Sequence, residues 1–159
     1  NGTNGVTGPT GPSWITSQDN QTAAVTVNSF TFVNLPGLTR TINLASPAKL
    51  LVFTDGGIQT TSAATAGYSI VDVVIMVNGG LMADGGFKRI GALNNTGLVN
   101  NLGFWSMSDF VSTVSGSFTL PAGTYTIDVR ARLNGGSNAT VGGNNLSVLQ
   151  GIMQIMIIQ

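Results

Sequence analysis

The sequence predicts an all-β sandwich of about 8–10 antiparallel strands, preceded by a short segment of Gly-X-Y triplets. Short runs rich in Val, Ile, Thr and Phe alternate with Gly and Asn clusters, as in all-β domains. No window places apolar residues at helical spacing behind a capping residue. We therefore divide the chain into residues 1–13, the triplet segment, and residues 14–159, a globular domain.

The triplet segment predicts the end of a collagen-like triple helix. Glycine occupies Gly2, Gly5, Gly8 and Gly11, and proline follows the last two of them. Only glycine fits at the axis where three extended chains meet, so a strict three-residue period is typical of collagen. A flexible linker would share the composition, but two in-frame Gly-Pro triplets favour the triple helix. A triple helix implies three parallel copies of the chain, and we expect Trp14 to be a core residue or an axial plug that caps the junction where the triplets end.

Composition excludes several function classes. The 159 residues carry six Lys or Arg, six Asp, no Glu, no His and no Cys, for a net charge of zero. Six scattered cations do not make a nucleic-acid-binding face, and no apolar run is long enough to cross a membrane. Without His or Cys, the common nucleophile–base pairs and transition-metal sites are absent. We expect no enzyme, no cofactor and no metal, and the low charge favours an extracellular surface.

In the first half of the domain, turn-forming clusters separate the predicted strands. The strands are 24–35, 39–44, 49–54, 58–62 and 68–77. Predicted turns lie at 35–37, 55–57 and 78–80, and the Asn-Gly-Gly of the last is the strongest hairpin signal in the chain.

The second half predicts strands at 87–93, 104–114, 117–120, 124–133 and 146–159. Two polar segments, 94–103 and 134–145, are predicted to be surface loops. Within 124–133, Ile127 and Val129 alternate with Asp128 and Arg130. This strand should therefore have one dry face and one wet face.

The final predicted strand is apolar on both faces. We assign its odd positions, such as Met153 and Ile155, to the core. Leaving four apolar side chains of the other face in water would forfeit several kcal/mol, so that face needs cover. A loop of the same chain or neighbouring subunits could supply it, and the triplet segment favours subunits around a three-fold axis. The predicted trimer interface is therefore Trp14 with Val148, Gln150, Ile152, Gln154, Met156 and Ile158.

Asp72 is the only polar residue on one face of the most hydrophobic strand. A buried carboxylate needs a partner, and Arg40, Arg130 or Arg132 could supply one. We take Asp72 with Arg130 as the candidate buried ion pair. It would fix strand register rather than bind a ligand.

The segments 8–13, 77–80 and 118–125 carry a resemblance to a known family. The chain resembles collagen-like proteins that end in a trimeric jelly-roll head, the tumour-necrosis-factor and complement globular-head superfamily. Bacterial members include spore-surface collagen-like glycoproteins, and similar heads tip phage and viral fibres. Proline in the second triplet slot and threonine in the third favour a microbial or viral source. The resemblance implies a jelly roll, a homotrimer, and a place on a cell, spore or virion surface.

The leading hypothesis is a structural surface or fibre protein, whose head trimerises, registers a collagen-like stalk and exposes loops for attachment. One alternative is a receptor- or glycan-binding knob that uses the loops 94–103 and 134–145. Another is a monomeric carbohydrate-binding sandwich. Trp105 and Tyr68 are candidates for a sugar-stacking platform, although aromatic residues in strands usually belong to the core.

Overall fold

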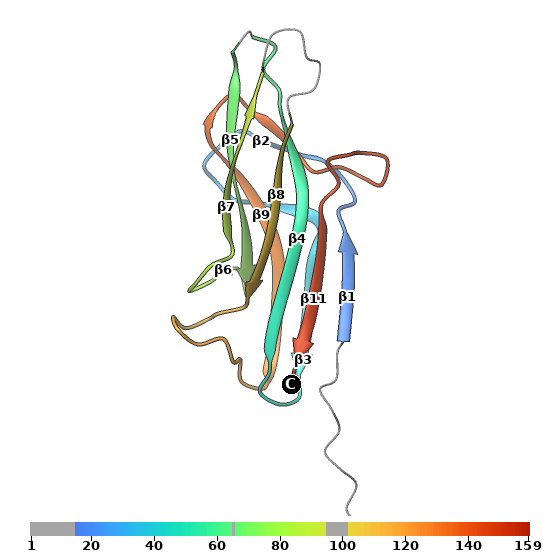
Figure 1. Cartoon of the computed structure of the whole chain (residues 1–159), viewed down its shortest axis with the longest axis vertical. Helices are drawn as coiled ribbons and strands as arrows, with labels where there is room; N and C mark the ends of the chain where they lie inside the picture. The colour runs from blue at the N-terminus through green and yellow to red at the C-terminus, as the bar shows by residue number, and fades with distance from the viewer. Residues whose placement is uncertain (1–14, 65, 95–101) are drawn as a thin grey trace, which may run out of the picture.

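Two antiparallel sheets pack face to face in the computed structural model, which describes residues 15–64, 66–94 and 102–159 (Figure 1). All the regular elements in those ranges are β-strands, so the prediction of an all-β sandwich is confirmed. Trp14 and the glycines Gly2, Gly5, Gly8 and Gly11 lie outside the described residues. The strands are β1 (Ile15–Asn20), β2 (Val25–Val27), β3 (Val33–Leu44), β4 (Lys49–Thr60), β5 (Tyr68–Val77), β6 (Gly80–Leu81), β7 (Phe87–Leu93), β8 (Leu102–Phe110), β9 (Gly123–Gly136), β10 (Ala139–Val141) and β11 (Ile152–Ile158).

We call the two layers sheet A and sheet B. Sheet A has the order β1-β11-β4-β10-β2, and β8 pairs along the other side of β4. Sheet B has the order β3-β9-β5-β6, and β7 also pairs with β5. The long strands of the molecule thus form two four-stranded layers, β1-β11-β4-β8 against β3-β9-β5-β7.

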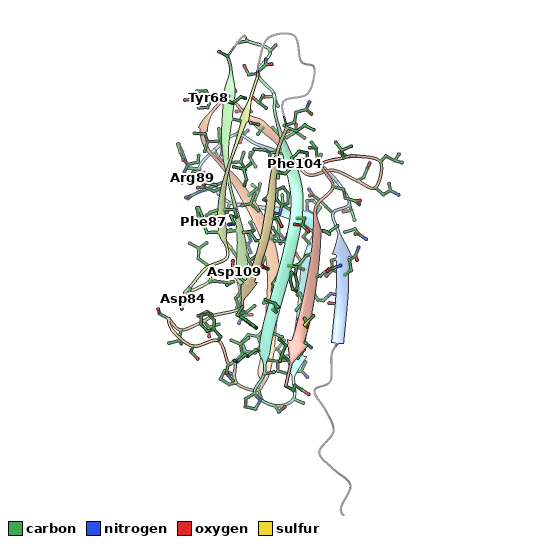
Figure 2. All side chains as sticks on the ribbon, viewed as in Figure 1. Tyr68, Asp84, Phe87, Arg89, Phe104 and Asp109 are labelled. Carbon is green, nitrogen blue, oxygen red and sulfur yellow. The ribbon has the colours of Figure 1, made fainter. Side chains whose placement is uncertain are left out.

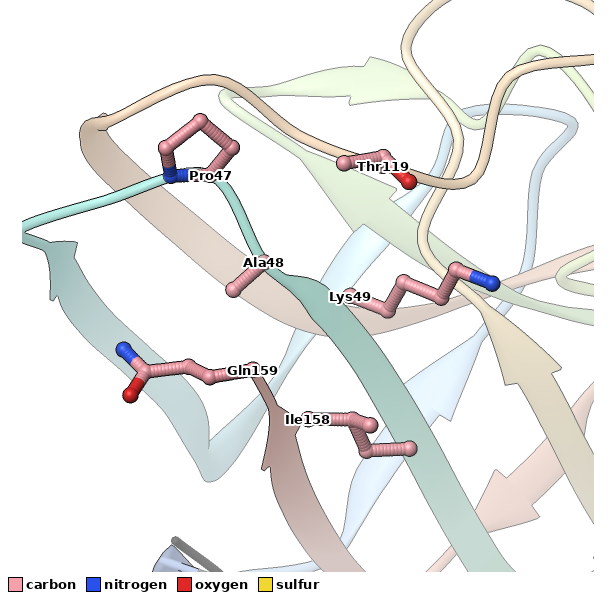
Figure 3. A pocket seen from close by; sticks show the side chains of 6 residues that line it. All are labelled: Pro47, Ala48, Lys49, Thr119, Ile158 and Gln159. Carbon is pink, nitrogen blue, oxygen red and sulfur yellow. The ribbon is translucent and has the colours of Figure 1, made fainter. Parts of the chain in front are cut away.

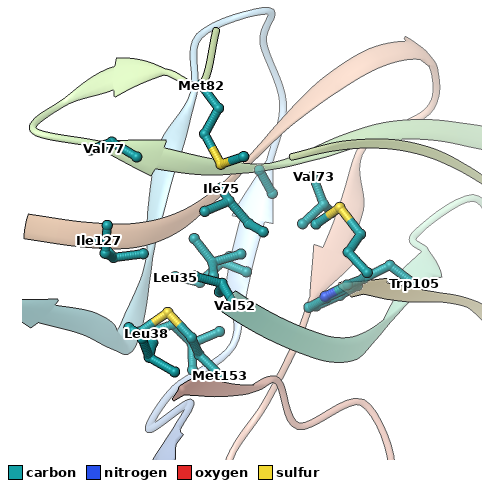
Figure 4. Close-up of a cluster of buried hydrophobic side chains, with 14 of the residues drawn as sticks. Leu35, Leu38, Val52, Val73, Ile75, Val77, Met82, Trp105, Ile127 and Met153 are labelled. Atoms are coloured by element: carbon teal, nitrogen blue, oxygen red, sulfur yellow. The ribbon is translucent and has the colours of Figure 1, made fainter. Parts of the chain in front are cut away.

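The core lies between the sheets and takes alternate residues from each strand. Figure 4 shows Val52 and Met153 of sheet A packed toward Ile75 and Ile127 of sheet B, and all four are essentially inaccessible to solvent. The dry face predicted for β9 is confirmed, because Ile127, Val129 and Ala131 are all fully buried. Complete burial of each such side chain contributes about 1.5–3 kcal/mol, so this layer dominates the stability of the domain.

The glycines predicted to end a strand at 55–57 lie inside β4 instead. A Cβ on Gly56 would lie 2.2 Å from the ring of Trp105, and one on Gly57 would lie 2.7 Å from Leu149 Cδ2. Glycine occurs here because a neighbouring side chain occupies the space of a Cβ. The predicted turn was wrong because the sequence does not distinguish close approach from a bend.

The other two predicted turns differ in outcome. Residues 35–37 form an irregularity within β3, where the register with β9 shifts between Asn34 and Thr39, rather than a turn between strands. The hairpin at 78–80 is confirmed. Asn78 and Gly79 have φ angles of 51° and 78°, and they link Val77 to its partner Gly80 in the two-residue loop that such angles permit.

A bidentate ion pair links the two sheets at one edge of the sandwich. Arg40 of β3 donates from Nε and Nη2 to the carboxylate of Asp19 in β1, at 2.7 and 2.6 Å. Both residues lie on the core-facing side of their strands, since Arg40 is opposite Ile127 and Asp19 is opposite Met153. The pair therefore closes the edge where β1 and β3 would otherwise leave the core open.

Two segments of the second half differ from the sequence-based assignment. Residues 117–120 form no strand, and only single bridges tie Ser117 to Val114 and Leu120 to Ala48. The predicted loop 134–145 contains the end of β9 and all of β10. This segment is therefore part of both sheets rather than a free surface loop.

Candidate assembly interface

Strand β11 lies in the middle of sheet A, between β1 and β4. Its odd positions face the core as predicted, with Met153 at 0% and Ile155 at 1% exposure. Its even positions face away from sheet B, where Ile152, Met156 and Ile158 are half-buried and Gln154 is exposed. The outward face of β11 is thus largely apolar and only partly covered.

Neighbouring strands extend this apolar surface. In β4, Leu51 lies opposite Met156, and in β8 Phe110 lies opposite Leu51. Further along β8, Phe104 projects on the same side and is 60% exposed. We define the outer face of sheet A as Leu51, Phe53, Phe104, Phe110, Ile152, Met156 and Ile158. Every strand of the described residues belongs to one of the two sheets, so no strand crosses over this face.

Charged and polar groups border the outer face of sheet A at both ends. Asp55 lies opposite Ile152 at one end and Lys49 lies opposite Ile158 at the other. The Lys49 ammonium lies 6.0 Å from the centre of the Phe110 ring, which in turn lies 6.2 Å from the ring of Phe118.

Polar side chains also lie within the face: the exposed Gln154 separates Ile152 from Met156 on β11 and donates to Gln18 of β1, and Ser106 and Ser108 separate Phe104 from Phe110 on β8. Apolar and polar side chains are mixed in this way in many protein–protein interfaces, which as a whole are about as apolar as the rest of a protein surface.

A shallow pocket of about 310 Å³ continues this face at the end where β11 stops (Figure 3). Ile158 belongs to both the face and the pocket, and Lys49, at the border of the face, also lines the pocket. Pro47, Ala48, Thr119 and Gln159 complete its lining. Its position beside Ile158 makes it part of the same surface rather than a separate site.

Two of the predicted interface residues lie elsewhere. The strand begins at Ile152 rather than at 146, because turns occupy the preceding residues, with Ser147 Oγ accepting from the amide of Leu149. Val148 is therefore a loop residue, 79% exposed. Gln150 donates from Nε2 to the carbonyl of Gln21 at 3.0 Å. The prediction that Val148 and Gln150 share a face with Ile152 was wrong for this reason.

Asp72 is fully buried, but its partners are Arg89 and Arg132 rather than Arg130. Register explains the difference, because Arg89 in β7 and Arg132 in β9 both lie directly opposite Asp72 in β5. Arg130 lies opposite Val74 and binds Asp128 instead. The predicted pairing of Asp72 with Arg130 is therefore corrected. Arg130 precedes Arg132 by two residues in β9, so it lies beside Val74, two residues further along β5 than Asp72.

The Asp72 carboxylate accepts four hydrogen bonds. Arg89 donates from Nε and Nη2 at 2.7 and 3.1 Å, and Arg132 Nε and Asn134 Nδ2 each donate at 3.0 Å. Burial opposes ionisation of this carboxyl, but the guanidinium hydrogen bonds and charges outweigh burial and hold the pKa of Asp72 below its usual value. The group therefore stays ionised at neutral pH.

The proposed sugar-stacking pair does not exist in the structure. Trp105 is buried in the core and its indole Nε1 donates to Thr54 Oγ1 at 3.3 Å. Tyr68 is 46% exposed at the start of β5. The two rings therefore cannot form one platform.

No metal-binding group is evident in the described ranges, where no three His, Cys, Asp or Glu side chains come together. The oxygens of Asp84 are occupied by Ser112, Ser115 and the amide of Gly116. The Gly116 amide and the Ser115 hydroxyl lower the pKa of Asp84.

No helix of the described residues has the length and apolar character to cross a membrane.

Comparison with known proteins gives no family. No family model and no curated protein matches the sequence. Similar solved structures include a chain of the T13 IBDV viral particle (11% identity, TM-score 0.42), one of infectious bursal disease virus Gx strain (15%, 0.36), and the infectious bursal disease virus VP2 subviral particle (12%, 0.32). The alignments cover 91%, 94% and 91% of this chain but only 37%, 38% and 37% of those chains. At these identities and TM-scores, the similarity transfers neither a function nor an assembly to this chain.

Proposed function

We propose that residues 14–159 are a trimerising jelly-roll head that brings together and registers three collagen-like N-terminal segments. The role is architectural rather than catalytic, on the surface of a cell, spore or virion. The observation that carries the proposal is the outer face of sheet A, an apolar surface spread over β11, β4 and β8. A monomer would leave Phe104 and the uncovered parts of the other side chains of this face in water, whereas assembly would cover them.

The strand order supports the jelly-roll assignment. Two four-stranded antiparallel layers, β1-β11-β4-β8 and β3-β9-β5-β7, are what an eight-stranded jelly roll requires. The first and last strands lie side by side in sheet A, and the chain crosses between the layers from β3 to β4 and again from β4 to β5.

The position where the chain enters the domain supports assembly through sheet A. Ile15, the first residue of β1, pairs with Ile157 near the end of β11. The N-terminal segment therefore joins the domain on the sheet that carries the apolar face. Three heads packed through this face would bring three such segments close together, as a triple helix requires.

Mass measurement in solution tests the proposal. Size-exclusion chromatography with light scattering should give three times the 16.3 kDa protomer mass. Ile152→Asp, which adds a charge to the outer face of sheet A, should yield a folded monomer. Asn43→Asp is the matched control, because it adds the same charge to an exposed position of β3 in the other sheet and should stay trimeric. A monomeric native chain, or a trimeric Ile152→Asp variant, would refute assembly through this face.

A further inference from the structure

The outward side of sheet B carries three of the four arginines of the chain. Four of the six basic residues lie on β7 and β9, and three of them, Arg89, Arg130 and Arg132, project from the side of sheet B that faces away from the core. We call this side the outer face of sheet B. Assembly through sheet A leaves this face in contact with solvent.

The three arginines form two adjacent rows. In the first row, Arg132 of β9 and Arg89 of β7 flank Asp72 of β5. In the second, Arg130 of β9 flanks Val74 of β5. Two residues along a strand separate the rows by about 6.6 Å, so the guanidinium groups form one compact cluster.

The carboxylates lie beneath the guanidinium groups. The side chains of Asp72 and Asp128 are 0% and 4% exposed, whereas those of Arg89, Arg130 and Arg132 are 54%, 28% and 28% exposed. The acids therefore fix the arginines from below, while the surface that meets solvent is cationic. Arginines held in this way lose little side-chain entropy when they bind a ligand.

Each arginine keeps hydrogen-bond donors for a ligand. Arg89 and Arg130 use Nε and Nη2 on their aspartates, and Arg132 uses only Nε. Among the described residues, Nη1 of all three arginines has no hydrogen-bond partner. These donors match the oxygens of a carboxylate or sulfate group.

Aromatic side chains flank the cluster. Figure 2 shows Tyr68, Arg89 and Phe87 following one another along the side of the molecule formed by β5 and β7. Phe87 is 41% exposed and shares a row with Arg130, since both lie opposite Val74. The Arg132 guanidinium carbon lies 4.4 Å from the centre of the Phe32 ring. Exposed aromatic rings beside charged donors offer an apolar surface to the face of a sugar ring that presents its C–H groups.

We propose that the outer face of sheet B binds an acidic polysaccharide, a sugar chain that carries carboxylate or sulfate groups. The arginines bind the acidic groups, and Phe87 and Tyr68 contact the sugar rings. A protein of zero net charge with three such cations provides too few phosphate contacts for general nucleic-acid binding. The site does not depend on trimerisation, but a trimer would present three copies of it and gain avidity on a repeating polymer.

Binding to immobilised polymers tests the site. The full chain is passed over heparin as the sulfated polymer, polygalacturonate as the carboxylated polymer and dextran as the neutral polymer. We expect binding to at least one acidic polymer, no binding to dextran, and weakening as sodium chloride rises. The two acidic polymers distinguish sulfate from carboxylate as the recognised group.

Three variants assign the binding to the face. Arg89→Gln should weaken it about 10-fold or more, the loss expected for a charged hydrogen bond. Lys88→Gln removes the same charge from the adjacent residue, whose side chain leaves the opposite side of β7, and should change binding less than about twofold. The double variant Asp72→Asn with Arg89→Gln restores the native net charge but also frees Arg132 from Asp72, so it should bind at least as weakly as Arg89→Gln, and native-like binding by it would show that net charge rather than Arg89 is recognised.

The proposal is overturned if neither acidic polymer binds, if dextran binds equally well, or if Arg89→Gln binds as Lys88→Gln does. It is also overturned if duplex DNA binds as tightly as the polysaccharide. Light scattering on the same samples gives the oligomeric mass. Failure of the binding site is therefore distinguished from failure of the proposed assembly.

Discussion

Met156 offers the sharpest test of the proposed assembly, because it lies in the middle of the outer face of sheet A. Its side chain is half-buried already, between β1 and Leu51 of β4. Assembly would cover only the remainder, about 0.5–1 kcal/mol per copy out of the roughly 1.5–3 kcal/mol that full burial contributes. Met156→Ala should therefore weaken a trimer by about 1.5–3 kcal/mol, or roughly 10- to 100-fold in the association constant.

Met156→Asp should have a much larger effect, because desolvation of a charge exceeds the loss of apolar area. The effective penalty is several kcal/mol per buried ion, and three copies enter each trimer. The sum is on the order of 10 kcal/mol, which lowers the association constant by about seven orders of magnitude. The variant should be monomeric at concentrations where Met156→Ala remains trimeric.

Light scattering over a dilution series gives the association constant of the trimer. Thermal unfolding followed by circular dichroism gives the stability of the folded chain. Met156→Asp also loses the burial that Met156 already has within the monomer, about 1–2 kcal/mol, which is a minor part of the stability of a typical domain, so the monomer should remain folded with a lowered melting temperature. If Met156→Asp and Met156→Ala show the same mass and the same dissociation on dilution, Met156 lies outside any interface. The assignment of the outer face would then fail.

Two further predictions concern the domain itself. Asp72→Asn should lower the free energy of unfolding by about 1–3 kcal/mol at neutral pH, because a charged network loses its acceptor. The folded-state pKa of Asp72 lies below the unfolded value, so its contribution is present above about pH 4 and is lost as the pH falls through the folded-state pKa. Urea unfolding at several pH values should therefore show the difference between the native chain and the variant shrinking in acid, and a constant difference would contradict this account. Gly56→Ala should destabilise by about 1–3 kcal/mol through its clash with Trp105, whereas Gly91→Ala, whose added Cβ would meet no atom within 4 Å, should be close to neutral in the same thermal unfolding assay. Equal melting temperatures for these two variants would show that Gly56 is not required by close packing.

Local patterns predicted the features that depend on neighbouring residues in sequence. The alternation in β9 placed Ile127 and Val129 in the core, because side chains in a strand change face at every residue. The Asn78-Gly79 pair predicted a hairpin, because both residues accept positive φ. The same alternation correctly placed the odd positions of β11, Met153 and Ile155, in the core.

Features that depend on distant pairing were not predictable in detail. The partner of Asp72 follows from the register of β5 with β7 and β9, which the sequence does not specify. Likewise, a glycine occurs within β4 at position 56 because Trp105, which is distant in the sequence, occupies the space that a Cβ would need. The outer face of sheet A was predicted from β11 alone, whereas Leu51 and Phe110 join it only through strand pairing.

The neighbouring positions of β1 and β11 have a consequence for when the domain can fold. Sheet A needs β11 between β1 and β4, although both of those strands precede it by a long stretch of chain. Pairings between such distant segments form slowly, because a large loop must close before any contact compensates for the lost entropy. The sandwich therefore completes late, after Ile152–Ile158 has been synthesised. If the heads bring the N-terminal segments together, a stalk would wind from the head outward and only after synthesis of the head is finished.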